Sequence, residues 1–143
     1  MVKQTYTNHT RRFPLVHFVI FPLLILNFLY QAFRLYQERS MDRSGWLVLA
    51  IVFMLIALSA RVQALVVQDR TIRLEERLRY KELLSPELAK QASDLPTGKI
   101  IALRFASDEE LSDLVGQVLG GKLTTSKEIK MAVKNWRGDH LRV

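Results

Sequence analysis

The hydrophobic pattern of this chain is dominated by two long stretches that contain no charged residue. No Asp, Glu, Lys or Arg lies between Arg12 and Arg34, and none lies between Arg43 and Arg61. Both stretches are apolar on every side of a helix, whereas a helix on the surface of a soluble protein carries a polar face. Since about 20 apolar residues span the hydrocarbon core of a bilayer, the pattern predicts two transmembrane helices.

Helix breakers set the ends of these elements. Pro14 suits a first helical turn, and Ser85-Pro86 is the first breaker after the second stretch. The predicted organisation is an N-terminal segment (1–13), a first transmembrane helix (14–35), a short external loop (36–45), a second transmembrane helix that continues as a stalk (46–84) and a small helical segment (85–143). The expected fold is an all-α membrane protein, with a two-helix transmembrane hairpin whose second helix extends into the cytoplasm.

The stalk carries a seam at heptad spacing. Alternating steps of four and three residues connect Ala60, Ala64, Val67, Thr71, Leu74 and Leu78. This spacing is typical of a coiled coil, so we expect the seam to bind a partner protein or a second copy. The alternative is that this amphipathic helix folds back onto the C-terminal segment of the same chain. The opposite face is charged, and Glu75 and Arg79 have the spacing of an ion pair.

Residues 85–143 show short helical patterns separated by turn residues. The signals are the start Ser85-Pro86-Glu87, the capping box Ser107-Asp108-Glu109-Glu110, the stop Gly120-Gly121, and the cap Ser126 before a last helix at 127–136. Residues 99–106 fit either a helix or a strand, and their helical neighbours favour a helix. Because a segment of this size has marginal stability when it folds alone, we expect it to pack against the stalk or against a partner.

No residue pattern in this sequence indicates an enzyme. The absence of cysteine excludes disulfides, thiolate catalysis and cysteine-based metal sites. His17 lies about one turn into the first apolar helix, but Asn27 is about 15 Å further along the axis, too far to cooperate with it. We therefore predict no catalytic residue, no cofactor, no metal ligand and no small-molecule substrate. A proton or ligand role for His17 stays open.

Basic residues beside the apolar stretches indicate contact with anionic lipid headgroups. The chain has a net charge of +7, and Lys and Arg near transmembrane helices favour the cytoplasmic side. The residues expected at the membrane interface are Arg11, Arg12, Trp46 and Arg61. With two crossings, both termini are expected in the cytoplasm.

A basic face on the last predicted helix supports a second functional hypothesis. Lys127, Lys130, Lys134 and Arg137 lie largely on that face, and such a face could dock RNA or a membrane-bound ribosome. A third hypothesis is an accessory subunit of a transporter or pore. The apolar stretches contain no carboxylate to hold a transported ion, and two helices enclose no substrate pathway.

Four stretches of the chain resemble a known family. They are Asn8-His9-Thr10-Arg11-Arg12 with Pro14-Leu15-Val16-His17-Phe18, then 67–78, then 102–111, and the ending 127–137. Over nearly its full length the chain resembles a family of small bacterial two-span membrane proteins of unknown function, sometimes labelled transporter permeases. The resemblance implies a bacterial inner-membrane location and no assigned activity. The favoured function is a non-enzymatic membrane subunit or scaffold.

Overall fold

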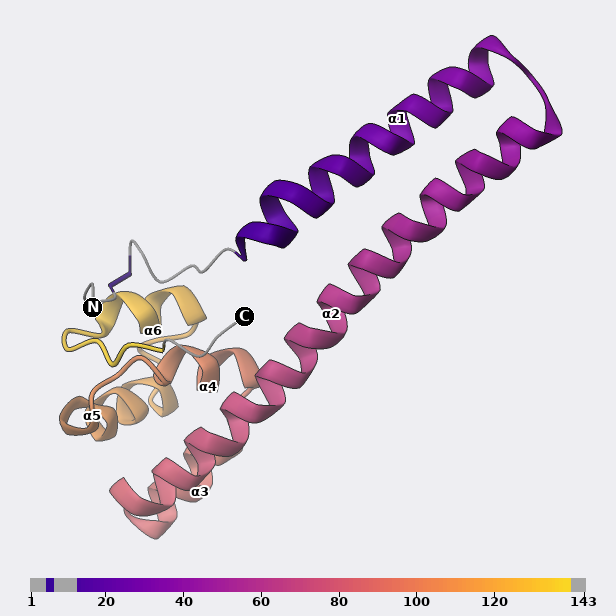
Figure 1. The fold of residues 1–143 in the computed structure, drawn as a ribbon. Coiled ribbons are helices and arrows are strands. Elements are labelled where there is room, and N and C mark those ends of the chain that lie inside the picture. Colours follow the sequence, from indigo (N-terminus) through magenta and orange to yellow (C-terminus); the bar gives the residue numbers. More distant parts are fainter. Residues whose placement is uncertain (1–4, 7–12, 140–143) are drawn as a thin grey trace. The chain divides into compact units, whose positions relative to one another are not determined.

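A computed structural model describes residues 5–6 and 13–139 of the chain (Figure 1). The helical elements, in chain order, are the π-helix η1 (Leu15–Ile20), α1 (Phe21–Gln37), α2 (Met41–Leu83), α3 (Pro86–Ser93), α4 (Thr97–Leu103), α5 (Asp108–Leu119) and α6 (Ser126–Ala132). Within the described ranges no strand occurs, and the fold is all-helical with two long apolar helices. The chain divides into two compact units, with the boundary inside α2 between Leu65 and Val66.

The first unit contains η1, α1 and the first part of α2. The predicted loop at 36–45 is too long, because α1 continues to Gln37 and α2 already begins at Met41. Ser40 explains the early start, since its Oγ accepts a hydrogen bond of 3.2 Å from the backbone N–H of Arg43 and so caps the helix. Arg43 Nε also donates to the Glu38 carboxylate over 3.1 Å, which holds the short connection together.

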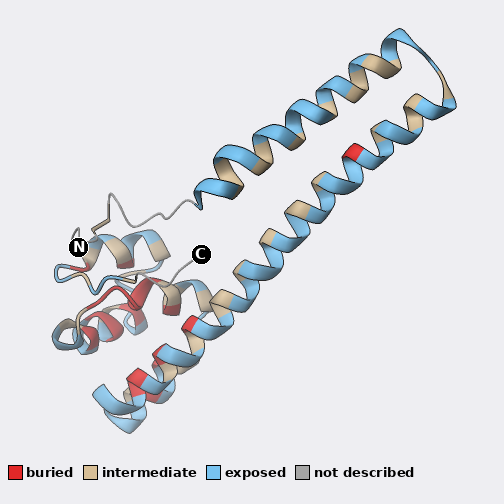
Figure 2. Ribbon diagram, in the orientation of Figure 1, coloured by how far each residue is buried: buried red, intermediate tan, exposed pale blue. Residues whose placement is uncertain are grey.

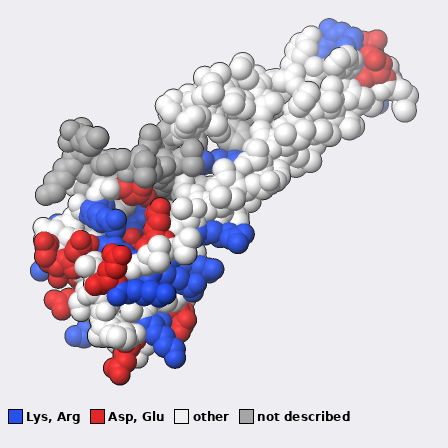
Figure 3. All heavy atoms as spheres, turned by 60° about the horizontal axis from the view of Figure 1, so that its bottom comes forward, with Lys and Arg blue, Asp and Glu red and all other residues white. Residues whose placement is uncertain are grey.

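Apolar side chains cover the outside of this unit. Among its described residues Ala50 alone is buried, and large side chains such as Phe18 and Leu26 are more than half exposed (Figure 2). Charged side chains gather near the connection between α1 and α2 (Figure 3). By length and composition, the helices over Leu15–Gln37 and Met41–Leu83 could cross a membrane.

The second unit, which in the described part of the chain contains residues 5–6 and 66–139, is a compact helical domain that we call the helical module. Its core consists of buried apolar side chains from α2 to α6 and from the segment after α6: Tyr80, Leu84, Ala89, Ala92, Ile100, Ala102, Leu103, Ala106, Leu111, Leu114, Val115, Val118, Ile129 and Val133. Tyr80 and Leu84 come from the end of α2 and its exit. The C-terminal segment therefore builds its core on the stalk helix.

Several predicted helix signals are confirmed. Residues 97–103 form helix α4, so the ambiguous stretch is helical for most of its length. Ser85 caps α3 by accepting a hydrogen bond from the Leu88 N–H. Helix α5 stops at Gly120, and Gly121 has a φ of +75°, a conformation that glycine adopts without steric cost.

The last helix is shorter than predicted. Its cap is Thr125 rather than Ser126, and it ends at Ala132. The backbone becomes extended at Val133, and the chain then pairs with the connection between α4 and α5 through an isolated bridge between Ala106 and Trp136. Because the backbone groups beyond Ala132 find partners on other elements, continuing the helix offers them no advantage.

Candidate functional site

Helix α2 presents two different faces within the helical module. Ile72, Glu76 and Tyr80 are buried and lie one helical turn apart, so they share one face. This face packs against the C-terminal helices. It contains two charged residues, Glu76 and Arg79, that are almost fully buried, and it is the face that the sequence indicated as charged.

An ion cluster built around Arg79 fastens this face to the rest of the module. Arg79 Nη2 lies 2.6 Å from Asp108 Oδ1, and Arg79 Nε donates to the same oxygen over 2.9 Å. Arg79 Nη2 also donates to the Ala106 carbonyl over 2.7 Å, and Nη1 donates to Glu76 Oε2 over 3.1 Å. The predicted pairing of Arg79 with Glu75 is therefore wrong. Arg79 instead joins α2 to the start of α5.

Glu76 is the other buried member of the cluster. Its Oε1 lies 3.4 Å from Arg137 Nη1, so its two carboxylate oxygens face two different arginines. Burial raises the pKa of Glu76, and the charges of Arg79, Arg137 and Arg104 oppose that shift. Burial, followed by the nearby Glu76, also raises the pKa of the Tyr80 phenol. The cluster is thus a structural joint in which buried charges compensate one another.

Glu110 forms a second fastening point that the sequence did not reveal. Its carboxylate accepts hydrogen bonds from the backbone N–H groups of Ser107, Lys134 and Asn135 over 3.2, 3.1 and 3.1 Å. The capping-box pattern predicted the bond to Ser107. The two bonds to residues beyond α6 tie the extended C-terminal segment to the start of α5, and no spacing in the sequence signals them.

The seam of α2 lies on the opposite side of the helix from the packed face. Two residues along a helix correspond to a rotation of about 200°, so Leu74 and Leu78 point away from Glu76 and Tyr80. Val67, Leu74 and Leu78 are 62%, 61% and 54% exposed. Ala60, Ala64 and Thr71 are exposed as well. Within the helical module, the C-terminal segment thus packs mainly on the charged face of α2 and leaves Val67, Thr71, Leu74 and Leu78 exposed.

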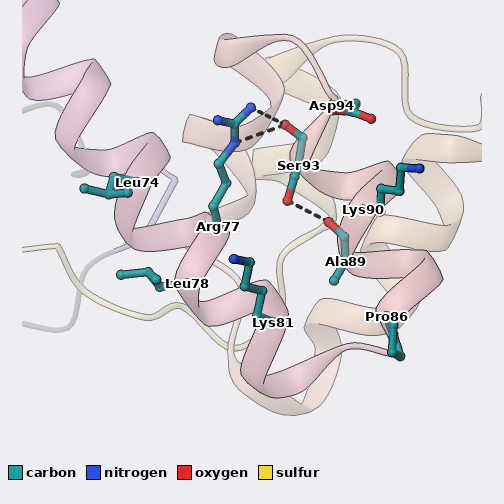
Figure 4. Close-up of a pocket in the computed structure, with 9 residues that line it drawn as sticks. All are labelled: Leu74, Arg77, Leu78, Lys81, Pro86, Ala89, Lys90, Ser93 and Asp94. Atoms are coloured by element: carbon teal, nitrogen blue, oxygen red, sulfur yellow. Dashed lines mark hydrogen bonds between the residues drawn. The ribbon is translucent and has the colours of Figure 1, made fainter.

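A groove runs beside the seam, between α2 and α3 (Figure 4). It has a volume of about 680 Å³, and its lining residues are Leu74, Arg77, Leu78, Lys81, Pro86, Ala89, Lys90, Ser93 and Asp94. Arg77 fixes the distance between the two helices, because its Nε and Nη2 donate to the Ser93 carbonyl over 3.3 and 2.8 Å. The groove therefore combines apolar side chains with a basic rim.

The four predicted basic residues do not share one helix face. Lys127 and Lys130 lie on α6, whereas Lys134 and Arg137 follow its end. Arg137 is paired with Glu76, and the Lys130 ammonium lies 5.8 Å from the centre of the Phe105 ring. The predicted continuous basic surface is thus divided, because the last helix stops early.

The sequence matches, over residues 1–143, the family described as Family of unknown function (DUF6526). The chain belongs to this family. No curated protein and no solved structure matches it. The predicted membership of a family of unknown function is therefore confirmed, while bacterial origin and membrane crossing stay predictions.

Two of the remaining predicted residues of this DUF6526 protein, Trp46 and Arg61, lie in the first unit. Trp46 is about half exposed on α2, and Arg61 is partly buried further along the same helix. Arg11 and Arg12 lie outside the described residues. His17 Nδ1 lies 3.0 Å from the Phe13 carbonyl oxygen. Within the described residues no group of three or more His, Cys, Asp or Glu side chains could hold a metal ion.

Proposed function

We propose that this DUF6526 protein is a non-enzymatic membrane scaffold that binds a partner through the exposed seam of α2. The single observation that carries the proposal is that the two faces of α2 differ in burial. One face of its C-terminal part is buried in the helical module, while the seam on the other side exposes Val67, Leu74 and Leu78. Exposed side chains of this size at heptad spacing suit a helical partner.

The membrane anchor is part of the same proposal. Burying apolar surface stabilises by about 25 cal/mol per Å², and the large apolar side chains of α1 and the first part of α2 stay exposed within their own unit. A bilayer would cover them. We propose the bacterial inner membrane as the location, in agreement with the resemblance described above, with anionic headgroups beside Arg61 and both termini in the cytoplasm.

Single-cysteine labelling tests the anchor and its orientation. The natural chain contains no cysteine, so Arg39→Cys in the α1–α2 connection and Asp113→Cys on α5 each introduce one unique thiol. A membrane-impermeant maleimide added to spheroplasts should label Arg39→Cys, and it should label Asp113→Cys only after the membrane is opened. Labelling of Asp113→Cys in closed spheroplasts, or recovery of the chain in the soluble fraction, would overturn this part of the proposal.

A charged substitution in the seam tests the scaffold role. Leu74→Asp should shrink the complex that the protein forms after gentle detergent extraction, because the carboxylate would be buried without a partner at the interface. Met131→Asp is the matched control, since Met131 is a 62% exposed apolar residue on α6, away from the seam. An unchanged complex in the Leu74→Asp variant would contradict the proposal.

A further inference from the structure

We infer that the partner of the α2 seam is the same seam of a second copy, aligned in parallel. The inference rests on the proposed function, because it names the occupant of the surface that the proposal leaves open. It is carried by charged residues on both sides of the exposed seam. Their pattern is complementary to itself in one orientation only.

The seam fits the core positions of a heptad. Val67 and Leu74 take the d position, and Thr71 and Leu78 take the a position. Thr71 is compatible with burial there, because its hydroxyl already donates to the Val67 carbonyl over 3.1 Å. A second helix placed on this face would therefore cover exposed apolar surface without leaving that hydroxyl unpaired.

The flanking positions carry opposite charges on the two sides of the seam. The g positions hold Arg70 and Arg77, and the e positions hold Glu75 and Glu82. Arg70, Glu75 and Glu82 are exposed. Arg77 is partly buried because it bonds to the Ser93 carbonyl, and this contact holds it beside the seam. One edge of the seam is thus basic and the other acidic.

Only a parallel pair matches these edges. In a parallel coiled coil each g residue faces the e residue five positions later in the other helix. Arg70 would then face Glu75 of the second copy, and Arg77 would face Glu82 of the second copy. An antiparallel pair would bring arginine against arginine and glutamate against glutamate. An unrelated helix with a uniform charge would be repelled at one of the two edges.

A shared membrane would favour the same orientation. Copies with the same topology in one bilayer have their α2 helices pointing the same way. The seam covers only two heptads in the helical module, which is short for a coiled coil in water. Anchoring both copies in one membrane raises their effective concentration, so a weak seam is sufficient for pairing.

Disulfide formation between single cysteines tests the inference on the full-length protein in membrane vesicles. In a parallel pair, the same d residue of both copies meets across the interface, at a distance that a disulfide can bridge. Leu74→Cys and Val67→Cys should therefore give a covalent homodimer on mild oxidation. Ser112→Cys, exposed on α5, is the control for random collision. A homodimer yield for Leu74→Cys no higher than that for Ser112→Cys would overturn the inference.

A charge swap supplies the second test in the Leu74→Cys background. Arg70→Glu alone or Glu75→Arg alone should lower the rate of dimer cross-linking by about tenfold, because each change creates two like-charge pairs per dimer. The double variant should restore the rate. Failure of the double variant to restore it would rule out the parallel alignment.

The two proposals fail in different ways. If Leu74→Asp leaves the extracted complex unchanged, the scaffold role itself is wrong. If Leu74→Asp breaks the complex but Leu74→Cys forms no homodimer, the seam binds a different protein and only the inference is wrong.

Discussion

Arg79 connects α2 with residues 106–108, which follow it by 27 to 29 positions in the sequence. Its guanidinium group contacts Glu76 on α2, the Ala106 carbonyl after α4 and Asp108 at the start of α5. The side chain is almost fully buried, while Asp108 is largely exposed. Burying a charge lowers the stability of the fold unless its partners are all present. The contact between α2 and the start of α5 therefore depends on Arg79.

Replacing Arg79 should strongly destabilise the helical module. Arg79→Met keeps an unbranched apolar stem but removes the guanidinium group with its four hydrogen bonds and leaves Glu76 with less compensation. We expect a loss of about 3–5 kcal/mol in the free energy of unfolding. Urea unfolding in detergent, followed by Trp136 fluorescence in a Trp46→Phe background, would measure it.

The control for this variant is Lys122→Met, which removes the same charge from an exposed loop position. It should change stability by less than about 0.5 kcal/mol. A loss for Arg79→Met as small as that of the control would show that the ion cluster does not hold the module together.

Glu110 should control the local order of the C-terminal segment. Glu110→Ala removes the acceptor for the N–H groups of Ser107, Lys134 and Asn135. The segment would then be held mainly by the bond from the Arg137 N–H to the Phe105 carbonyl and by the stacking of Trp136 on Phe105 at 4.7 Å. We expect easier quenching of Trp136 fluorescence by acrylamide.

Glu109→Ala is the matched control, because Glu109 is an exposed carboxylate in the same first turn of α5. It should leave the quenching of Trp136 unchanged. Equal quenching in the two variants would mean that the loss of negative charge at the helix start, rather than the bonds to Lys134 and Asn135, causes the effect.

At the scale of single residues, the sequence predicts local contacts better than distant ones. The bond between Ser107 and Glu110 follows from a spacing of three residues, and it is present. Arg79 also has Glu75 at a favourable spacing, yet it turns to Asp108, which offers two short bonds next to a buried carbonyl. Such a choice depends on the fold and cannot be deduced from spacing alone.

The start of α6 shows how a single cap depends on pH. Glu128 accepts hydrogen bonds from the N–H groups of Thr124 and Thr125 and from the Thr124 hydroxyl. The bonds from the Thr125 N–H, and then those from Thr124, lower the pKa of Glu128 below its ordinary value of 4.5. A lowered pKa stabilises the folded state above pH 4.5, and this contribution is lost as the pH falls through the lowered pKa.

Glu128→Gln should therefore destabilise the protein more at neutral pH than in acid. The difference in melting temperature between the natural protein and the variant should be largest near pH 7 and should shrink as the pH falls below 4.5. Thermal unfolding at several pH values, followed by Trp136 fluorescence, would show this trend. A difference that is constant with pH would contradict the role of the ionised carboxylate.

At the scale of elements, helix boundaries set by a residue next to the helix are easier to predict than boundaries set by contacts with other elements. The predicted starts near Pro86 and Asp108 are correct because a side chain next to the helix determines them. The end of α6 at Ala132 depends on Glu110, Phe105 and Ala106, which lie on other elements. The early start of α2 was missed because Ser40 lies within polar residues that resemble a loop.

For the whole molecule, the proposed membrane anchor predicts unfolding in two steps. Urea in detergent should first remove the Trp136 signal of the helical module. Most of the helical circular dichroism of the two apolar helices should persist, because their backbone hydrogen bonds are internal and a micelle excludes water. A single transition that removes both signals together would contradict this expectation.

The sequence predicts the order of the helices, but it does not predict which face of α2 packs against the C-terminal helices. The two apolar helices follow from stretches without charge. Glu76 and Arg79 look like surface residues in the sequence, and their burial was not expected. From the sequence, we expect the seam to be covered, either by the C-terminal segment or by a partner. In the structure the seam is exposed. The ion cluster around Arg79 instead packs the charged face of α2 against the C-terminal helices.

The position of Tyr80 in the core has a consequence for the order of synthesis. Tyr80 belongs to α2, while Val133 and Ile129, which share its core, are translated much later. Under the proposed membrane anchor, the apolar part of α2 would therefore insert while the core around Tyr80 is still open. The core around Tyr80 can close only after Ile129 and Val133 have left the ribosome, so a chain terminated before these residues would carry an unfinished domain.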